Sequence, residues 1–228
     1  MNSGKRYKEA ASSYDYEKLY GGAEAVLMSK QMAKAKFDET IELVLRLGID
    51  PRKAEEMVRG TVALPSGTGR DVRVAVFAQG EAASIAREAG ANLVGDTDLA
   101  AEIEKGMFDF DIVIATPDMM PVVGKLGRTL GPRGLMPNPK TGTVTDNVAK
   151  AVEEFKGGMI EYRTDKFGNV QIPIGKASFE DSALLENFDA VMEEIHRAKP
   201  SSAKGKYIKK AVVSSTMGPG VKIDEGSL

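Results

Sequence analysis

The clearest pattern in the chain is an alternation of apolar and polar side chains that ends at Ile49. Apolar residues occupy every odd position from 41 to 49, and all even positions from 40 to 48 except Val44 are polar or glycine. A period of two over this length predicts a β-strand over 37–49 with one buried and one open face. We expect a helix over 22–33 before it, and a helix from Pro51 to Met57 and a strand over 61–64 after it.

Beyond residue 70 the pattern changes to short apolar runs separated by helical segments. The strands are expected at 72–76, 92–94 and 111–115, and the helices at 81–88, 99–105, 117–126 and 146–155. Strands that alternate with helices are typical of parallel βαβ units. The sequence therefore predicts a three-layer, Rossmann-like α/β sandwich in the middle of the chain.

After residue 158 the chain returns to the style of its beginning. Strands at 159–163 and 169–174 flank the turn 164–168 and predict a hairpin. An amphipathic helix over 184–198 and strands at 207–215 and 221–223 complete this part.

Two glycine-containing linkers, 66–69 and 156–158, bracket the middle segment. We therefore predict an inserted domain: a two-layer α+β domain from residues 1–67 and 159–228, and an α/β domain from 68–158. Two neighbouring chain crossings would form a hinge between them. Three sequential domains are the alternative, but residues 1–67 alone supply only two strands.

The residues needed for catalysis are scarce. The chain has no cysteine and a single histidine, His196, in the last turn of a predicted helix, where a cation is stabilised by the helix dipole. The phosphate-loop pattern also fails, because Lys125 follows a glycine but precedes Leu126. We expect no enzyme, no cofactor and no metal site, which weighs against the alternative of a nucleotide-dependent enzyme.

Other sequence features indicate the setting. No run of 18 apolar residues indicates a membrane helix, and the polar stretch 1–20 does not resemble a secretory signal. The lack of cysteine fits a reducing, cytoplasmic location.

The segment Ser214–Gly220 is the strongest candidate for binding, because it combines hydroxyls, a thioether and glycines on both sides of a proline. Small residues and hydroxyls allow close contact with RNA sugars and phosphates. The alternative is a turn at the end of a strand with Met217 buried. Since 31 basic residues face 33 acidic ones, any nucleic-acid binding must rest on local contacts.

Six motifs in order make the chain resemble the bacterial form of the large-subunit ribosomal protein L-one family. The resemblance extends from about residue 5 to residue 224. The motifs are Ala35–Glu42, Leu47–Arg52, Arg59–Val62, Leu130–Lys140, Gly175–Phe179 and Ser215–Pro219.

The resemblance implies one domain inserted into another and three RNA partners. These are large-subunit ribosomal RNA, exit-site transfer RNA near a mobile stalk, and the messenger RNA of the protein's own operon, whose translation it would repress. It also implies a cytoplasmic, ribosome-bound protein that is a monomer when free. A free repressor without a ribosomal role stays open as an alternative.

The resemblance further implies an RNA-binding surface on the domain built from the chain ends. Lys36, Phe37, Thr40 and Glu42 match on the long strand, although Phe37 could instead belong to the core. The other matching residues are Thr216, Met217 and Gly218 at the strand end, Ser215 and Pro219 beside them, and, more loosely, Arg163, Lys166 and Lys176.

Overall fold

A computed structural model describes residues 4–228 and divides the chain into two compact units. Within these residues, unit 1 comprises residues 4–69 and Glu161–Leu228, and unit 2 comprises Arg70–Ile160. The division lies two residues beyond each boundary expected from the sequence, at 69 against 67 and at 160 against 158. The predicted fold class, α/β with two domains, is confirmed.

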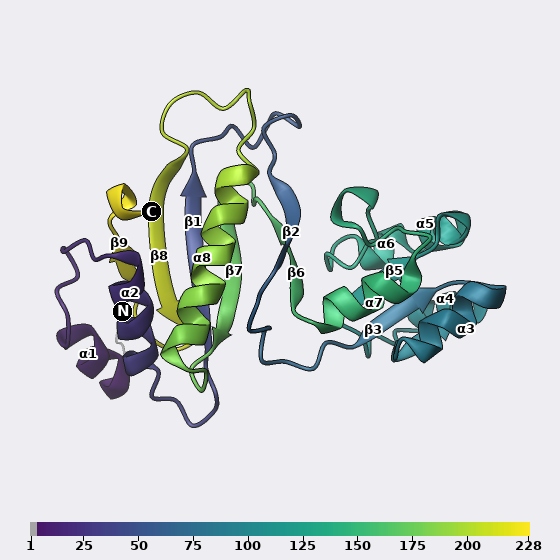
Figure 1. The fold of residues 1–228 in the computed structure, drawn as a ribbon, viewed down its shortest axis with the longest axis horizontal. Helices are drawn as coiled ribbons and strands as arrows, with labels where there is room; N and C mark the ends of the chain where they lie inside the picture. The colour runs from purple at the N-terminus through teal and green to yellow at the C-terminus, as the bar shows by residue number, and fades with distance from the viewer. Residues whose placement is uncertain (1–3) are drawn as a thin grey trace. The chain divides into compact units, whose positions relative to one another are not determined.

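Unit 1 is built on a four-stranded antiparallel sheet in the order β7-β1-β8-β9 (Figure 1). The strands are β1 (Thr40–Leu47), β7 (Asn169–Lys176), β8 (Ile208–Ser215) and β9 (Val221–Ile223). Strand β1 from the start of the chain is thus paired on both sides with strands from its end.

Among the described residues, helices cover one face of this sheet and leave the other open. The helices α2 (Gly22–Met32) and α8 (Asp181–Arg197) pack against the sheet and against each other. The odd-numbered residues of β1 lie beneath them, with Leu43 and Leu45 fully buried, while Glu42 and Arg46 are exposed on the opposite face. The predicted alternation is confirmed over β1, but the strand begins at Thr40, so Phe37 lies in the preceding loop.

The predicted hairpin over 159–174 is wrong. Strand β6 (Met159–Arg163) pairs with β2 (Arg59–Ala63) in a separate two-stranded sheet, whereas β7 joins the main sheet. The turn between them closes as expected, with Gly168 N donating to Asp165 O at 3.2 Å. Strands β6 and β7 do not pair with each other because the Thr164 amide donates to Val58 O. This hydrogen bond holds the end of β6 beside the segment that leads into β2.

The predicted helix from Pro51 to Met57 is also wrong, because this segment forms only turns. The Glu56 carboxylate accepts a hydrogen bond from the Asp50 amide at 2.7 Å, and the Asp50 carboxylate accepts one from the Arg52 amide. Side chains that bond nearby backbone groups in this way compete with the hydrogen bonds of a helix. Conversely, a helix absent from our prediction, α1 (Lys5–Ser12), precedes α2.

Unit 2 has a parallel three-stranded sheet between two layers of helices. The strands are β3 (Val74–Phe77), β4 (Leu93–Gly95) and β5 (Ile112–Ala115), in the order β4-β3-β5. The helices are α3 (Gly80–Glu88) and α7 (Val148–Lys156) on one face, and α4 (Thr97–Glu104), α5 (Met120–Lys125) and α6 (Gly127–Leu130) on the other. Short 3-10 helices occur at Pro117–Met119 and Pro139–Thr141, and a third, Glu225–Ser227, lies in unit 1.

A buried asparagine fixes the start of the first linker to unit 1. Asn187 on α8 is fully buried, and its amide group donates to Gly67 O at 3.0 Å and to Ile174 O at 2.8 Å. Its side-chain oxygen accepts from the Ser66 amide. Gly67 has a φ of 70°, which few other residues adopt, so glycine is required where the chain leaves the unit.

Candidate RNA-binding surface

Two loops meet at one end of the main sheet of unit 1. The pairing of β1 with β8 places Ile41 opposite Ser215, so the loop before β1 and the loop after β8 lie side by side. Pairing continues one step further, because Thr216 N donates to Thr40 O at 3.0 Å and Thr40 N donates to Thr216 Oγ1 at 2.9 Å. The antiparallel register therefore brings together two predicted groups of residues that are about 175 positions apart in sequence (Thr40 and Thr216 are separated by 176).

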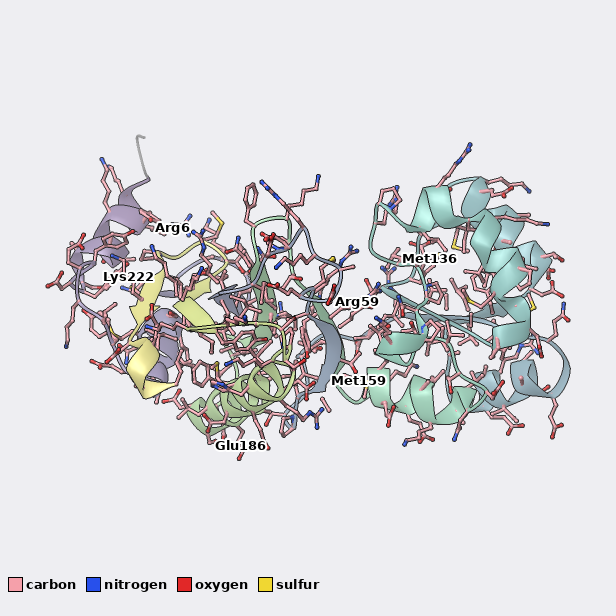
Figure 2. All side chains as sticks on the ribbon, turned by 90° about the horizontal axis from the view of Figure 1, so that it is seen from above. Arg6, Arg59, Met136, Met159, Glu186 and Lys222 are labelled. Atoms are coloured by element: carbon pink, nitrogen blue, oxygen red, sulfur yellow. The ribbon has the colours of Figure 1, made fainter. Side chains whose placement is uncertain are left out.

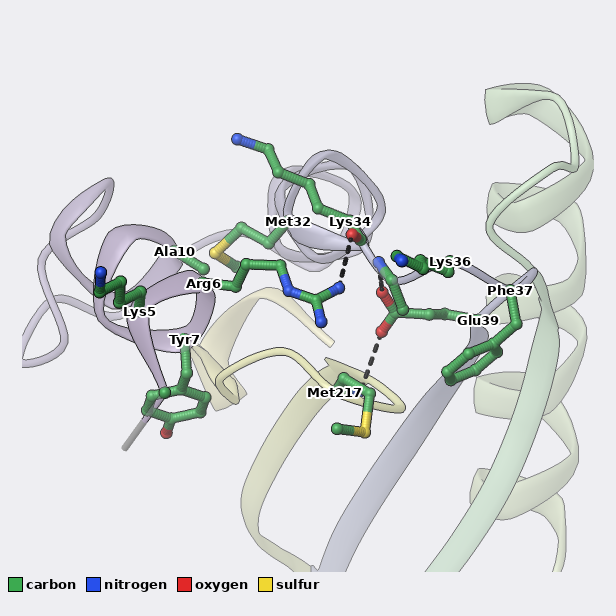
Figure 3. A pocket seen from close by; sticks show the side chains of 12 residues that line it. Lys5, Arg6, Tyr7, Ala10, Met32, Lys34, Lys36, Phe37, Glu39 and Met217 are labelled. Carbon is green, nitrogen blue, oxygen red and sulfur yellow. Dashed lines mark hydrogen bonds between the residues drawn. The ribbon is translucent and has the colours of Figure 1, made fainter. Parts of the chain in front are cut away.

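A buried carboxylate, Glu39, holds these two loops together. Glu39 is 1% exposed, and its Oε1 atom accepts a hydrogen bond from the Ala35 amide at 2.8 Å. Its Oε2 atom accepts two more, from Ser215 Oγ and from the Met217 amide, each at 2.8 Å. Figure 3 shows the bond to Met217. Hydrogen bonds of this kind compensate the carboxylate for the loss of water.

Glu39 was not among the predicted site residues, although the sequence carried a signal for it. Position 39 is in phase with the buried odd positions of β1, so the pattern places a carboxylate on the core side of the sheet. A charged residue is rarely fully buried unless it has partners. Such a residue directly before a strand therefore indicates an internal role.

Three of the predicted contact residues lie beneath the surface or pack tightly within it. Ser215 is 4% exposed, and its hydroxyl donates a hydrogen bond to Glu39 Oε2. A Cβ atom on Gly218 would lie 2.5 Å from Ser215 Oγ, so the loop requires glycine there. Pro219 is buried. These residues shape the loop. The Ser215 hydroxyl is bonded to Glu39, and the expected contact of Ser215 with RNA stays a prediction.

In the two loops, the predicted residues with exposed side chains are Lys36, Phe37, Thr216 and Met217. Phe37 is 54% and Met217 64% exposed, so neither belongs to the core, and the alternatives that buried them are wrong. The exposed side chains of Met217 and Phe37 are large apolar groups, and they are next in sequence to the Thr216 hydroxyl and the Lys36 ammonium group. This combination suits packing against an unstacked base or a ribose.

The opposite border of the surface is formed by β7 and the turn after it. Lys176 Nζ donates to Thr40 Oγ1 at 2.9 Å, and the Asp38 carboxylate accepts from the Ser178 hydroxyl at 2.7 Å. Glu42 is exposed on the open face of the sheet between Pro173 and Ser214 in the cross-strand register. The predicted residues Lys36, Phe37, Thr40, Glu42, Lys176 and 215–219 thus form one continuous group, which we call the Glu39 surface.

Arg163 and Lys166 do not belong to this group. They lie at the end of β6 and in turn 164–168, where the Leu47 amide donates to Gly168 O. Leu47 and Thr40 are the two ends of β1, and eight strand residues span about 25 Å. Figure 2 likewise shows Arg59, on the strand paired with β6, well away from Arg6 on α1. Two separate ends of unit 1 therefore carry candidate residues.

Within residues 4–228 there is no cluster of three or more histidine, cysteine, aspartate or glutamate side chains that could hold a metal ion. No helix in this part of the chain is long and apolar enough to cross a membrane.

Comparison with known proteins agrees with the geometry of unit 1. Residues 29–219 match the family described as "Ribosomal protein L1p/L10e family". The chain belongs to this family. The match begins in α2 and ends at Pro219, so it includes both loops of the Glu39 surface and all of unit 2.

Several curated relatives carry the name "Large ribosomal subunit protein uL1". The protein of Thermobifida fusca is 58% identical over 98% of this chain and 95% of its own length. Those of Cutibacterium acnes and Streptomyces avermitilis are also 58% identical, over 98% and 96% of this chain and 97% and 91% of their own lengths. The resemblance seen in the six motifs is confirmed, and the chain is a structural, non-enzymatic ribosomal protein. The nucleotide-dependent enzyme is excluded.

Replacing Glu39 by glutamine is expected to loosen both loops. The amide is nearly isosteric, but in either orientation its NH₂ group would face a backbone N–H, that of Ala35 or that of Met217, where only an acceptor fits. Leaving one buried donor unsatisfied costs about 1–3 kcal/mol. Urea denaturation should show that loss for Glu39→Gln and almost none for Glu42→Gln, an exposed carboxylate three residues away. Equal effects in the two variants would contradict this role of Glu39.

Proposed function

We propose that the Glu39 surface binds large-subunit ribosomal RNA. The observation that supports this most is the pair of loops fixed by one buried carboxylate, which presents Phe37, Thr216 and Met217 to solvent in a defined arrangement. A surface that is rigid before binding loses little conformational freedom when RNA arrives. As a member of its family, with relatives named for the large ribosomal subunit, the chain is a structural constituent of that subunit.

Each exposed group of the surface suits a different part of an RNA. Phe37 and Met217 offer apolar area to an unstacked base or a ribose, and hydroxyl and backbone groups around Thr216 can bond 2′-hydroxyls and phosphates. Lys36 and Lys176 are cations suited to phosphates. The Glu42 carboxylate can accept a hydrogen bond from a base amino group or a 2′-hydroxyl. Because these contacts are few and specific, they agree with a net charge near zero.

The same surface would serve the messenger RNA of the protein's own operon. One set of loops fixed by Glu39 can accept any RNA that presents the same sugars and bases, so the two RNAs would compete. In the alternative of a free repressor without a ribosomal role, the protein would be absent from large subunits in a sucrose gradient. We propose that the ribosomal role is primary and that repression follows from an RNA which mimics the ribosomal site.

The Arg163 end of unit 1 suits a second RNA, for which we propose exit-site transfer RNA. Turn 164–168 presents Phe167, which is 77% exposed, next to Lys166 and close to Arg163 in sequence. An exposed aromatic ring beside cations is typical of surfaces that stack a base and bind a phosphate. The spacing of the two ends along β1 would allow both RNAs to bind at once.

Met217→Ala is expected to weaken binding to deproteinised large-subunit ribosomal RNA by about 1–3 kcal/mol, the scale of a lost specific contact. Thr216→Val should do the same, although it also removes the acceptor for the Thr40 amide, so Met217→Ala is the cleaner variant. Filter binding gives the affinities, and thermal melts check folding. Thr97→Val in unit 2 is the control. Wild-type affinity in both Met217→Ala and Thr216→Val would refute the proposed surface.

The double variant Arg163→Gln/Lys166→Gln should separate the two RNA partners. Removal of two cations at this end should weaken transfer-RNA binding to the isolated protein by about tenfold, since each phosphate contact contributes separately. Affinity for ribosomal RNA should change less than twofold. If ribosomal RNA binding falls and transfer-RNA binding does not, the assignment of the two ends is reversed.

A further inference from the structure

A groove of about 800 Å³ lies directly beside the Glu39 surface in unit 1. One side is the first part of α1, and the other is the chain around Met32–Phe37 together with Met217 (Figure 3). A groove of this size is in the range that holds small ligands. Phe37 and Met217 line the groove and also belong to the Glu39 surface, so an RNA bound to that surface would lie at the mouth of the groove.

The first turn of α1 is electrostatically unfavourable without an anion. It begins with Lys5 and Arg6, contains no acidic residue, and its N-cap Gly4 provides no side-chain hydrogen bond. The N-terminus of a helix carries partial positive charge, so two cations there repel the helix dipole. A local conflict of this kind, which an anionic partner would relieve, is typical of binding sites.

The groove combines this cationic end with apolar walls. Its lining includes Ala10, Met32, Phe37 and Met217, and four cations, Lys5, Arg6, Lys34 and Lys36, stand around it. Among the described residues of the lining, Glu39 is the single carboxylate, and its oxygens already accept three hydrogen bonds.

The cations of α1 have no carboxylate partner within the described part of the chain. Lys34 pairs with Glu9 at 3.9 Å, and this ion pair leaves Lys5 and Arg6 unneutralised. Arg6 is held over the groove by a hydrogen bond from its Nη1 atom to Lys34 O at 3.3 Å (Figure 3). Its other guanidinium donors remain available to an occupant.

We propose that this groove takes one unstacked nucleotide of the bound RNA. The base would pack against Met32, Phe37 and Met217, and its phosphate would lie at Arg6 and the first turn of α1. This inference rests on the proposed binding of RNA by the Glu39 surface and extends that surface to α1. An acidic peptide would also suit the cations, but the aromatic and thioether walls, shared with the RNA surface, favour a nucleotide.

The first test compares two charge removals on the same helix. Arg6→Gln should weaken binding to deproteinised large-subunit ribosomal RNA about tenfold at moderate salt, as expected for a lost charge-assisted contact. The slope of log affinity against log salt should become shallower by about 0.7–0.9, the loss of one phosphate contact. Lys8→Gln, an exposed cation of α1 outside the groove lining, should leave affinity within twofold of wild type.

The second test fills the groove without changing charge. Ala10→Phe should weaken RNA binding at least about tenfold, because the added ring occupies the place of the base. Ala11→Phe adds the same volume outside the groove lining and should leave RNA binding unchanged. Circular dichroism checks that α1 is intact in both variants.

Each outcome of these tests decides the proposal. Equal effects of Arg6→Gln and Lys8→Gln, or wild-type binding by Ala10→Phe, overturn it, and the second result would leave an acidic peptide as the fitting occupant. If Met217→Ala weakens binding but the α1 variants do not, only the groove is wrong. If Met217→Ala also binds normally, the proposed RNA surface fails and the groove proposal fails with it.

Discussion

The candidate surface of this protein depends on the buried carboxylate of Glu39. The antiparallel register of β1 and β8 brings two distant loops to one end of a sheet, but adjacency alone does not fix their shape. Three hydrogen bonds to Glu39, from both loops and from a buried serine, turn them into one unit. Phe37 and Met217 are largely exposed in these loops, so their apolar side chains are available to a partner.

This arrangement is compatible with the proposed RNA binding by a chain with a net charge of −2. Proteins that bind nucleic acid through bulk electrostatics need an excess of cations. Here the cations are placed locally, at Lys36 and Lys176 around the Glu39 surface and at Lys5 and Arg6 on α1. The acidic residues that balance them are spread over both units. For the proposed RNA binding, the positions of the cations thus matter more than the net charge of the chain.

Much of the fold follows from the sequence because the decisive signals are local. The alternation over β1 and the strand–helix rhythm of unit 2 each record which side chains face a core. The errors arose where longer-range contacts decide. The Thr164 amide at the end of β6 donates a hydrogen bond to Val58 O, and β6 pairs with β2 instead of β7. The carboxylates of Asp50 and Glu56 accept hydrogen bonds from backbone amides in a segment that was predicted to be helical. Helix α1 has only eight residues and a polar sequence, which is too short for its apolar pattern to be distinguished from a loop.

The residues of the candidate site also fall into two groups, those that the sequence could reveal and those that only the structure reveals. Phe37, Thr216 and Met217 could be identified because their motifs resemble a known family. The burial of Ser215 and the hydrogen-bond partners of Glu39 emerge only when β1 and β8 are paired. The separation of Arg163 and Lys166 from the other residues required knowledge of which sheet β6 joins. Residues adjacent in a motif can therefore have opposite roles, one supporting and one exposed.

Amide hydrogen exchange on the full chain, free and bound to deproteinised large-subunit ribosomal RNA, tests the central claim most directly. The Met217 and Ala35 amides should exchange slowly already in the free protein, because Glu39 accepts their hydrogen bonds. RNA should add protection over residues 35–42 and 215–218 and leave turn 164–168 unchanged. Fast exchange of both amides in the free protein, or RNA protection confined to other segments, would contradict a binding surface organised by Glu39.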